Sequence, residues 1–420
     1  MSVAKTKSNV KKDPLVHLTR LPDPKVRHYW FSKLISVVVA LFICAIITTI
    51  LAPNSFILFF KYLGIGNFSN KLQVLTLLQN TAILLLISLA LVPAFKMKFW
   101  NIGGEGQTLM GALGAVICLK YMTGKMPNAL LILSCLAFAL VFSIIWAVIP
   151  AIFKAFFKTN ETLFTLMMNY LATYIVSYFI YFWYPNDRKI GILNQNGQEG
   201  WLPKLFGQAY LLNVLIVVVI TVLVFVYLRY SKHGYELTVV GESQNTEKYV
   251  GINVKKTIIR TLILSGALCG LAGFLLVNGT MPTIDPNSTV NGAGFTAILV
   301  AWLGHFNPFE MVFTAFLVSF ITLGGQHAGD MLIGSGESYY KVLIGVFFFV
   351  FIASEFFLKY KINFSSDAQR FFKKVRDFFA KIFGPIGRFF KKIGLAIANL
   401  FSKLFKKKEP SKKDSKNKEE

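Results

Sequence analysis

The sequence predicts an all-α protein that crosses a membrane many times, and three observations lead to this fold class. Hydrophobic residues make up 55% of the 420 residues and charged residues only 15%, against about 25% charged residues in an ordinary soluble domain. The mean hydropathy is +0.56. Apolar runs of about 20 residues, the length that spans a bilayer, recur along the chain. This composition excludes a disordered chain, a disulfide scaffold and an ordinary cytosolic enzyme.

About ten helical elements are predicted, of which seven are long apolar runs. These are Lys33–Leu51, Leu72–Phe95, Leu130–Phe153, Leu163–Trp183, Leu211–Tyr230, Ile258–Val277 and Val342–Leu358. Three further elements are shorter or rich in glycine, namely Asn101–Leu119, Gly294–Leu303 and Met311–Leu323. Short or glycine-interrupted elements in the two halves of a chain are typical of broken helices and of an internal inverted repeat, and we expect both here.

The basic residues predict that both ends of the chain are cytoplasmic. If the spans alternate from a cytoplasmic N-terminus, the inside segments are 1–33, 95–100, 154–160, 229–260, 304–310 and 359–420. These segments contain 36 of the 44 Lys and Arg residues. Without the segment after residue 358, the inside still has 18 against 8 outside. This follows the positive-inside rule. The net charge of +24 is therefore attributed to the inner face of a membrane, and nucleic-acid binding is not expected.

Three regions are predicted: a basic N-terminus (1–33), a membrane domain (34–358) and a basic tail (359–420). The tail contains 18 Lys and Arg residues against six Asp and Glu residues. Its phenylalanine pairs recur at spacings that fit one helical face, with a break at Gly384-Pro385. We expect an amphipathic stretch on anionic lipid, followed by disorder from residue 406 onward. A solvated tail without a specific role is the alternative.

Polar residues within the predicted spans mark candidate contact sites. Such groups are costly in hydrocarbon and usually face the bundle interior or a water-filled path. Gln79 and Asn80 lie midway through the second run, and Asn169 lies within Leu163–Trp183.

A glycine-rich segment, 103–106, opens the third element and contains Glu105, with Gln107 directly after it. Glycines weaken a continuous helix, and broken helices near the midplane are typical of transporter sites. For Glu105 and Gln107, a structural role and substrate contact are equally supported. A second glycine-rich entry lies at 292–295. Gly111 and Gly114 are better explained by helix packing.

The segment 231–256 differs from the other predicted loops because it combines glycines with a short amphipathic stretch. Ser243 is a suitable N-cap, and Gly251 suits the position just past the end of a short helix. A short helix between two spans forms a compact protrusion to which another protein can bind. An ordinary polar connector is the alternative, but the pattern is more ordered than a connector requires.

No known catalytic or metal-binding motif is found. The chain lacks a GxxxxGK[ST] phosphate loop, HExxH and GxSxG, so it is not expected to hydrolyse ATP itself. Its five histidines are scattered, and its four cysteines lie in apolar runs without a CxxC pair. We therefore expect no catalytic residue, no metal and no cofactor in this chain.

Several ordered blocks make the chain resemble permease subunits of ABC importers of the branched-chain amino acid, ribose and nucleoside superfamily. These blocks are Asn101–Gln107 followed by Gly111, Asn160–Tyr170, Gly234–Asn253, Ser265–Gly273, and Gly294–Gly304 followed by Asn307-Pro308. The amino-acid sequences of the first two blocks are similar to those of the nucleoside (simple-sugar) branch. The resemblance covers residues from about 72 to 358, and the N-terminus and tail lie outside it.

The resemblance implies the permease of an importer in a bacterial-type plasma membrane. The implied partners are a second permease chain, related or identical, a cytoplasmic ATPase that uses ATP and Mg²⁺, and an extracellular substrate-binding lipoprotein. It also implies that segment 231–256 couples to the ATPase, through Gly234, Tyr235, Glu236, Gly241, Glu242, Gly251, Ile252 and Asn253.

A nucleoside is the favoured cargo of this predicted importer. A neutral, hydroxyl-rich substrate suits amide partners, and aromatic faces can stack on a base. The resulting path residues are Gln79, Asn80, Glu105, Gln107, Asn169, Phe164 and Trp302, with Tyr170 as a further aromatic candidate. The alternatives are a permease for ribose, another simple sugar or branched-chain amino acids, an ion-coupled secondary transporter using Glu105 and Glu161, and a membrane-anchored scaffold.

Overall fold

The computed structural model describes residues 16–21, 26–187, 189–208, 210–242 and 251–364. Within these ranges the chain forms twelve helices and two strands. The helices are α1 (Val26–Leu51), α2 (Phe56–Phe68), α3 (Lys71–Lys96), α4 (Gly104–Met122), α5 (Asn128–Phe157), α6 (Glu161–Trp183), α7 (Leu211–Tyr230), α8 (Lys232–Glu242), α10 (Val254–Asn278), α11 (Ala293–Leu303), α12 (Pro308–Leu332) and α13 (Gly336–Lys359). The strands are β1 (Val16–Arg20) and β2 (Tyr360–Phe364). The all-α fold class is confirmed.

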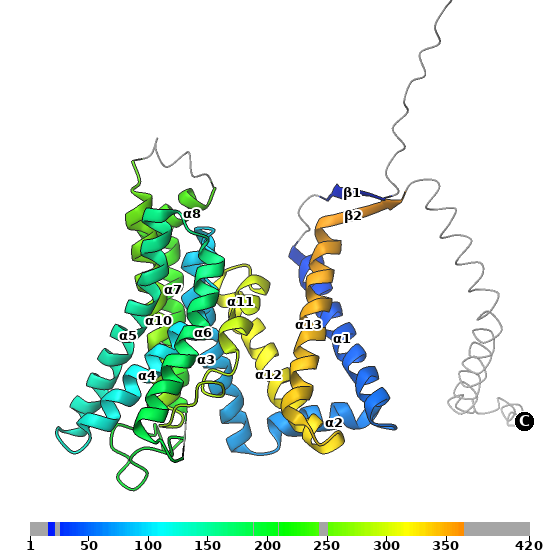
Figure 1. The fold of residues 1–420 in the computed structure, drawn as a ribbon. Coiled ribbons are helices and arrows are strands. Elements are labelled where there is room, and N and C mark those ends of the chain that lie inside the picture. Colours follow the sequence, from blue (N-terminus) through cyan, green and yellow to red (C-terminus); the bar gives the residue numbers. More distant parts are fainter. Residues whose placement is uncertain (1–15, 22–25, 188, 209, 243–250, 365–420) are drawn as a thin grey trace, which may run out of the picture. The chain divides into compact units, whose positions relative to one another are not determined.

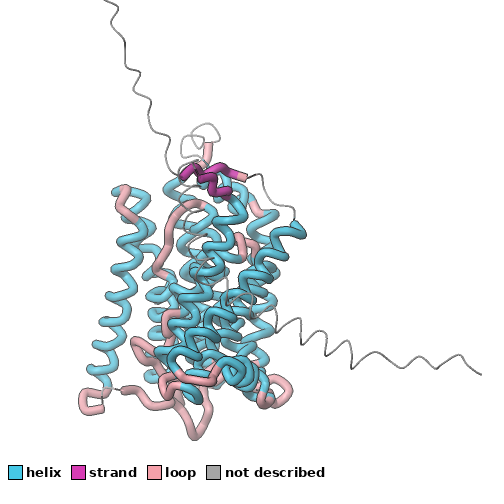
Figure 2. Tube along the Cα trace, turned by 90° about the vertical axis from the view of Figure 1, so that its right-hand side faces the viewer, coloured by secondary structure: helices cyan, strands magenta, loops and turns pink. Residues whose placement is uncertain are grey.

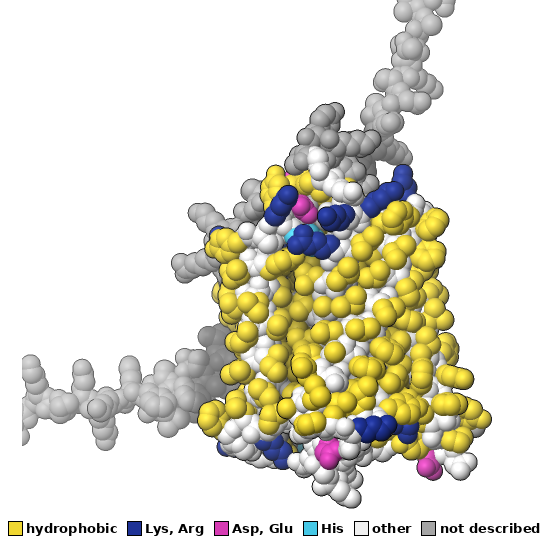
Figure 3. Space-filling model, turned by 90° about the vertical axis from the view of Figure 1, so that its left-hand side faces the viewer, with side chains coloured by type: hydrophobic (Ala, Val, Ile, Leu, Met, Phe, Trp, Pro, Cys, Tyr) yellow, Lys and Arg dark blue, Asp and Glu magenta, His cyan; other side chains and the backbone are white. Residues whose placement is uncertain are grey.

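Eight of the described helices are long and apolar enough to cross a membrane: α1, α3, α5, α6, α7, α10, α12 and α13. Four of these spans begin with an asparagine cap, whose side-chain oxygen accepts a backbone N–H of the first turn. The caps are Asn70, Asn160, Asn253 and Asn307. Figure 3 shows a broad band of hydrophobic side chains between two rims that carry charged ones, as a lipid-facing surface requires.

The chain divides into two compact units, of which the larger is 34–352. Its long helices run roughly along one direction (Figures 1 and 2), whereas the short α2 lies across them (Figure 1). The helices α3 and α10 are its most buried spans. The helix α10 packs on α3, α4 and α5, and α3 also packs on α7, α11 and α12. These two helices are therefore the core from which the other elements are positioned.

Glycines allow α4 to approach α10 closely at Gly111 and α5 closely at Gly114, as predicted for helix packing at these two positions. A Cβ on Gly111 would lie 2.8 Å from Gly270 Cα, and one on Gly114 would lie 2.6 Å from the Phe138 carbonyl oxygen. Both distances are too short for real Cβ contacts. Small residues at these crossings thus replace the apolar driving force that is missing between helices in lipid.

The smaller unit consists of 1–33 and 353–420 and contains a two-stranded antiparallel sheet. Val16 pairs with Phe364, and Arg20 pairs with Tyr360. In the sequence, β1 precedes α1 and β2 follows α13. The predicted amphipathic tail helix and its disordered end, from residue 365 onward, lie outside the described residues.

The structure changes three sequence-based expectations. The helix α2 was not predicted, since 13 residues interrupted by Lys61 and two glycines are too few to read as a span. The element predicted at Met311–Leu323 is a 25-residue helix, α12, that reaches Leu332. The segment at 103–106 does not break a helix, because α4 is continuous from Gly104 and only the segment before it is non-helical.

The predicted helix between Ser243 and Gly251 falls on residues 243–250, outside the described ranges. Within the described part of the segment, the helix is α8 (Lys232–Glu242), directly after α7. The internal inverted repeat stays a prediction.

Candidate functional site

An uncharged cavity of about 240 Å³ lies between α3, α10, α11, α12 and α13 and the segment before α11. None of its sixteen lining residues carries a formal charge. Ten of them bear an amide or a hydroxyl group: Gln79, Asn80, Thr280, Ser288, Thr289, Asn291, Thr296, Ser319, Thr322 and Tyr340. The remaining lining residues are aliphatic. Such a surface offers hydrogen bonds without selecting for a charged ligand.

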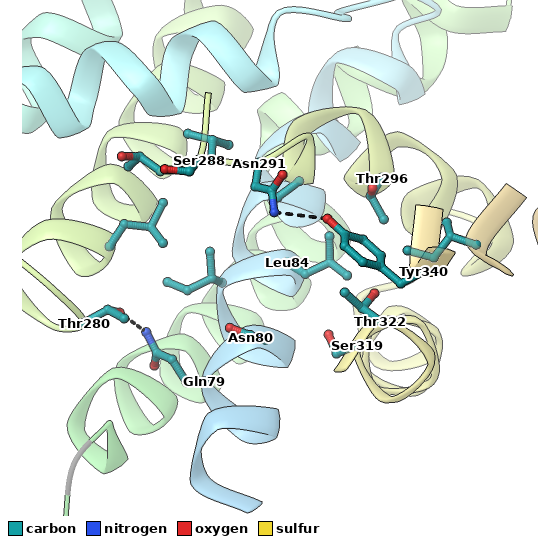
Figure 4. A pocket seen from close by; sticks show the side chains of 16 residues that line it. Gln79, Asn80, Leu84, Thr280, Ser288, Asn291, Thr296, Ser319, Thr322 and Tyr340 are labelled. Atoms are coloured by element: carbon teal, nitrogen blue, oxygen red, sulfur yellow. Dashed lines mark hydrogen bonds between the residues drawn. The ribbon is translucent and has the colours of Figure 1, made fainter. Parts of the chain in front are cut away.

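Two hydrogen-bonded pairs fix opposite parts of this cavity (Figure 4). Gln79 Nε2 donates to Thr280 Oγ1 at 2.6 Å, and Asn291 Nδ2 donates to the Tyr340 hydroxyl at 3.1 Å. Each pair joins elements that are far apart in the sequence, so the cavity depends on the packing of the whole 34–352 unit.

The cavity also contains polar groups without a protein partner. Gln79 Oε1 is buried and accepts no hydrogen bond from any described residue. Asn80 is exposed towards the cavity, and neither its amide nor the Ser319 hydroxyl is hydrogen-bonded to the described part of the chain. Since unpaired polar groups at membrane depth are costly, these atoms are suited to bind a ligand or water.

Glu105 lies behind the wall of the cavity. Its Oε1 accepts the Gly292 N–H at 2.8 Å, and its Oε2 accepts the Gly294 N–H at 2.7 Å. The carboxylate therefore caps the N-terminus of α11, where negative charge is favoured. A Cβ on Gly294 would lie 2.3 Å from the Glu105 nitrogen, so this approach needs glycine. Glu105 holds the segment that presents Asn291 and Thr296 to the cavity.

Gln107 and Asn169 belong to a different buried cluster that pairs the non-helical backbone before α4. Asn169 Nδ2 donates to the Ile102 carbonyl at 2.9 Å, and its Oδ1 accepts the Gly106 N–H at 2.9 Å. Gln107 Nε2 donates to Asn101 Oδ1 at 3.3 Å. Asn169 thus pairs the Ile102 carbonyl and an N–H of the first turn of α4, and Gln107 bonds the Asn101 side chain, which in turn accepts the Gly103 N–H. Neither residue lines the cavity.

The two predicted aromatic residues also lie away from the cavity. Phe164 packs against Phe153, with ring centroids 4.9 Å apart. Trp302 contacts Trp100 and lines a separate groove of about 460 Å³ beside α8. Of the seven predicted path residues, only Gln79 and Asn80 line this cavity, and Glu105 supports the segment that carries Asn291.

Sequence reasoning missed the partners of Gln79 and Asn80 in the second half of the chain. Ser319 and Thr322 lie three residues apart inside a predicted apolar element, and Asn291 directly precedes the second glycine-rich entry. The rule that selected Gln79 and Asn80, polar residues within spans, would have selected Ser319 and Thr322 as well. Tyr340 has no such signal, because tyrosine is common at membrane interfaces.

The predicted coupling residues are placed in different ways. Gly234 and Gly241 are packing positions, since a Cβ there would lie 2.3 Å from the Leu228 carbonyl oxygen and 2.2 Å from the Lys96 carbonyl oxygen. Tyr235 is 62% exposed, and Glu242 is exposed. Glu236 Oε2 lies 3.5 Å from the Thr257 hydroxyl. These contacts dock one side of α8 on the bundle and leave Tyr235 pointing outwards.

The other three predicted coupling residues follow the undescribed part of the segment and lead into α10. Gly251 has a positive φ of 72°, Ile252 packs against the hydrophobic core, and Asn253 caps α10 by accepting the Lys256 N–H at 3.1 Å.

The buried His233 side chain anchors α8 to α7 and α10. It is 1% exposed, its Nδ1 lies 2.8 Å from the Tyr227 hydroxyl and its Nε2 lies 3.2 Å from the Thr261 hydroxyl. Burial lowers the pKa of His233, and the positive charge of Arg260 lowers it further. The neutral imidazole is therefore the form that bridges α7 and α10.

Three segments predicted to lie inside the cell meet in the groove beside α8. Its lining includes Lys96 at the end of α3, Lys98 after α3, Gly241 on α8, and Phe306 after α11. These residues come from the predicted inside segments 95–100, 229–260 and 304–310. The structure therefore places the three segments at one end of the unit.

Comparisons with known proteins concern the membrane domain. Residues 73–352 match the family model described as "Branched-chain amino acid transport system / permease component". This match covers well over half of the chain and confirms the resemblance on which the sequence analysis relied.

Individual relatives match shorter parts. The guanosine ABC transporter permease protein NupP of Bacillus subtilis is 29% identical over 151 residues, 36% of this chain and 42% of the relative. The nucleoside ABC transporter permease protein NupB of Lactococcus lactis is 29% identical over 168 residues, 40% and 45% of the two chains. A glucose ABC transporter permease of Haloferax volcanii is 25% identical over 157 residues, 37% and 41%. The matched part is less than half the length of each relative.

Proposed function

Because the chain belongs to the family of permease components of branched-chain amino acid transport systems, we propose that it is the membrane-spanning permease of an ATP-driven importer and that its cargo is a nucleoside. The observation that carries the proposal of cargo is the neutral cavity lined by amide and hydroxyl groups. A ribose ring offers hydroxyl groups to such a wall, and a base offers donors and acceptors at its edges. Two relatives whose names refer to guanosine and nucleosides support this choice.

The absence of charge from the cavity wall argues against a free amino acid as cargo. A zwitterion would leave both its charges unpaired among the sixteen lining residues, and an unpaired charge at membrane depth is strongly unfavourable. A simple sugar fits the same hydroxyl chemistry. The relative named for glucose transport is less similar, at 25% identity, so the nucleoside is preferred.

The proposed importer contains further protein chains. A cytoplasmic ATPase hydrolyses ATP with Mg²⁺ and contacts the exposed side of α8, a second permease chain completes the path, and an external substrate-binding protein delivers the cargo. The basic tail contacts anionic lipid, and both chain ends are cytoplasmic. Movement of α8 is transmitted through His233 to α7 and α10, and packed helices switch between two arrangements to give alternating access.

The proposal is tested by replacing Asn80 in the complete importer and measuring labelled guanosine uptake. We expect Asn80→Ala to raise the KM about fivefold, since one lost hydrogen bond is worth about 1 kcal/mol and about 1.4 kcal/mol is a factor of ten. Thr76→Ala is the matched control on the same helix. The Thr76 hydroxyl donates to the Leu72 carbonyl and lies outside the cavity.

Competition with unlabelled compounds identifies the cargo class in the same assay. Excess nucleoside should abolish guanosine uptake, whereas glucose and leucine should leave it unchanged. Equal KM values for the Asn80→Ala and Thr76→Ala variants would show that the cavity is not the substrate site. Uptake of glucose but not of guanosine would replace the proposed cargo by a sugar.

A further inference from the structure

The outward face of α6 carries a row of tyrosines. Tyr170, Tyr174 and Tyr178 are 55%, 70% and 64% exposed. Residues four positions apart lie one above another on a helix, so the three rings share one face. The helix α6 packs mainly on α4 and α5, through its opposite side. The tyrosine face is therefore left uncovered by the part of the chain that the structure describes.

This row extends through the middle of the predicted membrane span. Tyr174 lies 13 residues after Glu161 and nine before Trp183, which is about 20 Å and about 14 Å along the axis at 1.5 Å per residue. Tyr170 lies about one turn closer to the start of α6. Tyrosine is usual at membrane interfaces, where its hydroxyl reaches water, but these two positions are in the hydrocarbon depth of the bilayer.

The hydroxyl groups of Tyr170, Tyr174 and Tyr178 have no hydrogen-bond partner among the residues that the structure describes. Two other polar side chains of α6 are satisfied within the helix. The Thr173 hydroxyl donates to the Asn169 carbonyl, and the Ser177 hydroxyl donates to the Thr173 carbonyl. The tyrosine row thus presents unpaired donors and acceptors at a depth where lipid supplies none.

The exposed face of α7 provides the contrast within the same bundle. Its outward residues are aliphatic, and include Val218, Val219, Val222, Leu223 and Val226, which are between 45% and 57% exposed. That pattern is the one expected for a helix against lipid. Two spans that are consecutive in the sequence and similar in exposure therefore differ in the chemistry that they present outwards.

We infer that the tyrosine face of α6 contacts a membrane-spanning helix of the importer's second permease chain. This inference rests on the proposed function, which includes such a chain, and adds the surface that it covers. A phenolic hydroxyl both donates and accepts, so a tyrosine row pairs with a hydrogen-bonding row on a chain of the same fold. The facing helix removes the unpaired hydroxyl groups from lipid, and the aliphatic face of α7 remains against lipid.

The test is thiol cross-linking in membranes that contain the complete importer. Tyr174→Cys is treated with a short bifunctional thiol reagent together with single-cysteine variants of the second permease, and Val222→Cys on α7 is the control. The native Cys44, Cys118, Cys135 and Cys269 are all buried, so they contribute little background. Tyr170→Cys is a second variant for the case that Tyr174→Cys fails to assemble.

We expect either tyrosine variant to give a product of two permease chains, identified by its peptides, at a yield at least fivefold above that of Val222→Cys. A photoreactive phenylalanine at position 174 should label the same partner peptide. Labelling of lipid alone, or yields from Tyr174→Cys and Tyr170→Cys no higher than from Val222→Cys, would overturn the inference.

Uptake measured on the same membranes separates this inference from the proposed function. ATP-dependent guanosine uptake without the cross-link would leave the proposed importer standing and refute the α6 contact. A permease–permease cross-link in membranes that take up no nucleoside, with every importer chain present, would support the contact and refute the proposed cargo.

Discussion

Replacing Glu105 by glutamine tests whether the carboxylate holds the wall of the cavity. The wild-type side chain accepts two backbone N–H groups at 2.8 and 2.7 Å. Glutamine keeps one acceptor oxygen but places an NH₂ group against the other N–H, so one hydrogen bond is lost and the other becomes neutral. Hydrogen bonds to charged groups contribute about 1.5–3 kcal/mol and neutral ones about 1 kcal/mol.

The expected net loss for Glu105→Gln is about 2–3 kcal/mol of the free energy of unfolding, because the relief from burying a charge offsets part of the lost bonding. Unfolding by SDS titration in mixed micelles measures this loss. The segment that carries Asn291 should also loosen, so that the KM for guanosine rises. Glu199→Gln is the matched control, since Glu199 Oε2 accepts the Gly124 N–H at an exposed site. It should change stability by less than about 0.5 kcal/mol.

A different pattern would refute this reasoning. If Glu105→Gln left the free energy of unfolding unchanged and abolished uptake driven by a proton gradient, Glu105 would be a proton carrier. The chain would then work as an ion-coupled transporter, the alternative that the sequence left open.

Three further predictions concern packing and coupling. Gly273→Ala places a Cβ 2.5 Å from the Thr108 carbonyl oxygen and should cost about 1–3 kcal/mol in SDS unfolding; a loss below 0.5 kcal/mol would contradict the packing. For His233, burial and the charge of Arg260 lower the folded-state pKa. The unfolded chain therefore binds the proton more tightly than the folded chain. The stabilisation by the neutral imidazole is complete above the ordinary pKa of about 6.5 and is lost as the pH falls towards the folded-state pKa. His233→Gln should flatten the pH dependence of the thermal midpoint between pH 5 and 7.5, whereas an unchanged slope would assign it to another group. Tyr235→Ala should reduce stimulation of the ATPase severalfold at unchanged thermal stability, because Tyr235 is exposed on α8; full stimulation would exclude this side chain from the contact.

The spans were predictable because their signal is local. An apolar run of about 20 residues has one stable solution in lipid, and observed helices such as α7 (Leu211–Tyr230) coincide with the predicted ranges. Long-range pairing gave no such signal. The strands β1 and β2 are short, and their paired residues Thr19 and Lys361 lie 342 positions apart, so neither strand could be recognised alone.

The candidate site was predicted only in part. Polarity within a span identified Gln79 and Asn80, but it could not separate residues that face a cavity from those that pair backbone. Asn169 and Gln107 have the same signal and complete the hydrogen bonding around the segment before α4. For Glu105 the sequence left two roles open, and the observed role depends on Gly292 and Gly294, far away in the chain. That contact appears only once α4 and α11 are packed together.

The most direct test of the central claim is guanosine uptake into proteoliposomes that contain this chain, the second permease, the ATPase and the binding protein. We predict uptake that requires ATP inside the cytoplasmic compartment, requires every component, and persists when ion gradients are collapsed. Uptake by this chain alone, driven by an ion gradient and indifferent to ATP, would contradict the account.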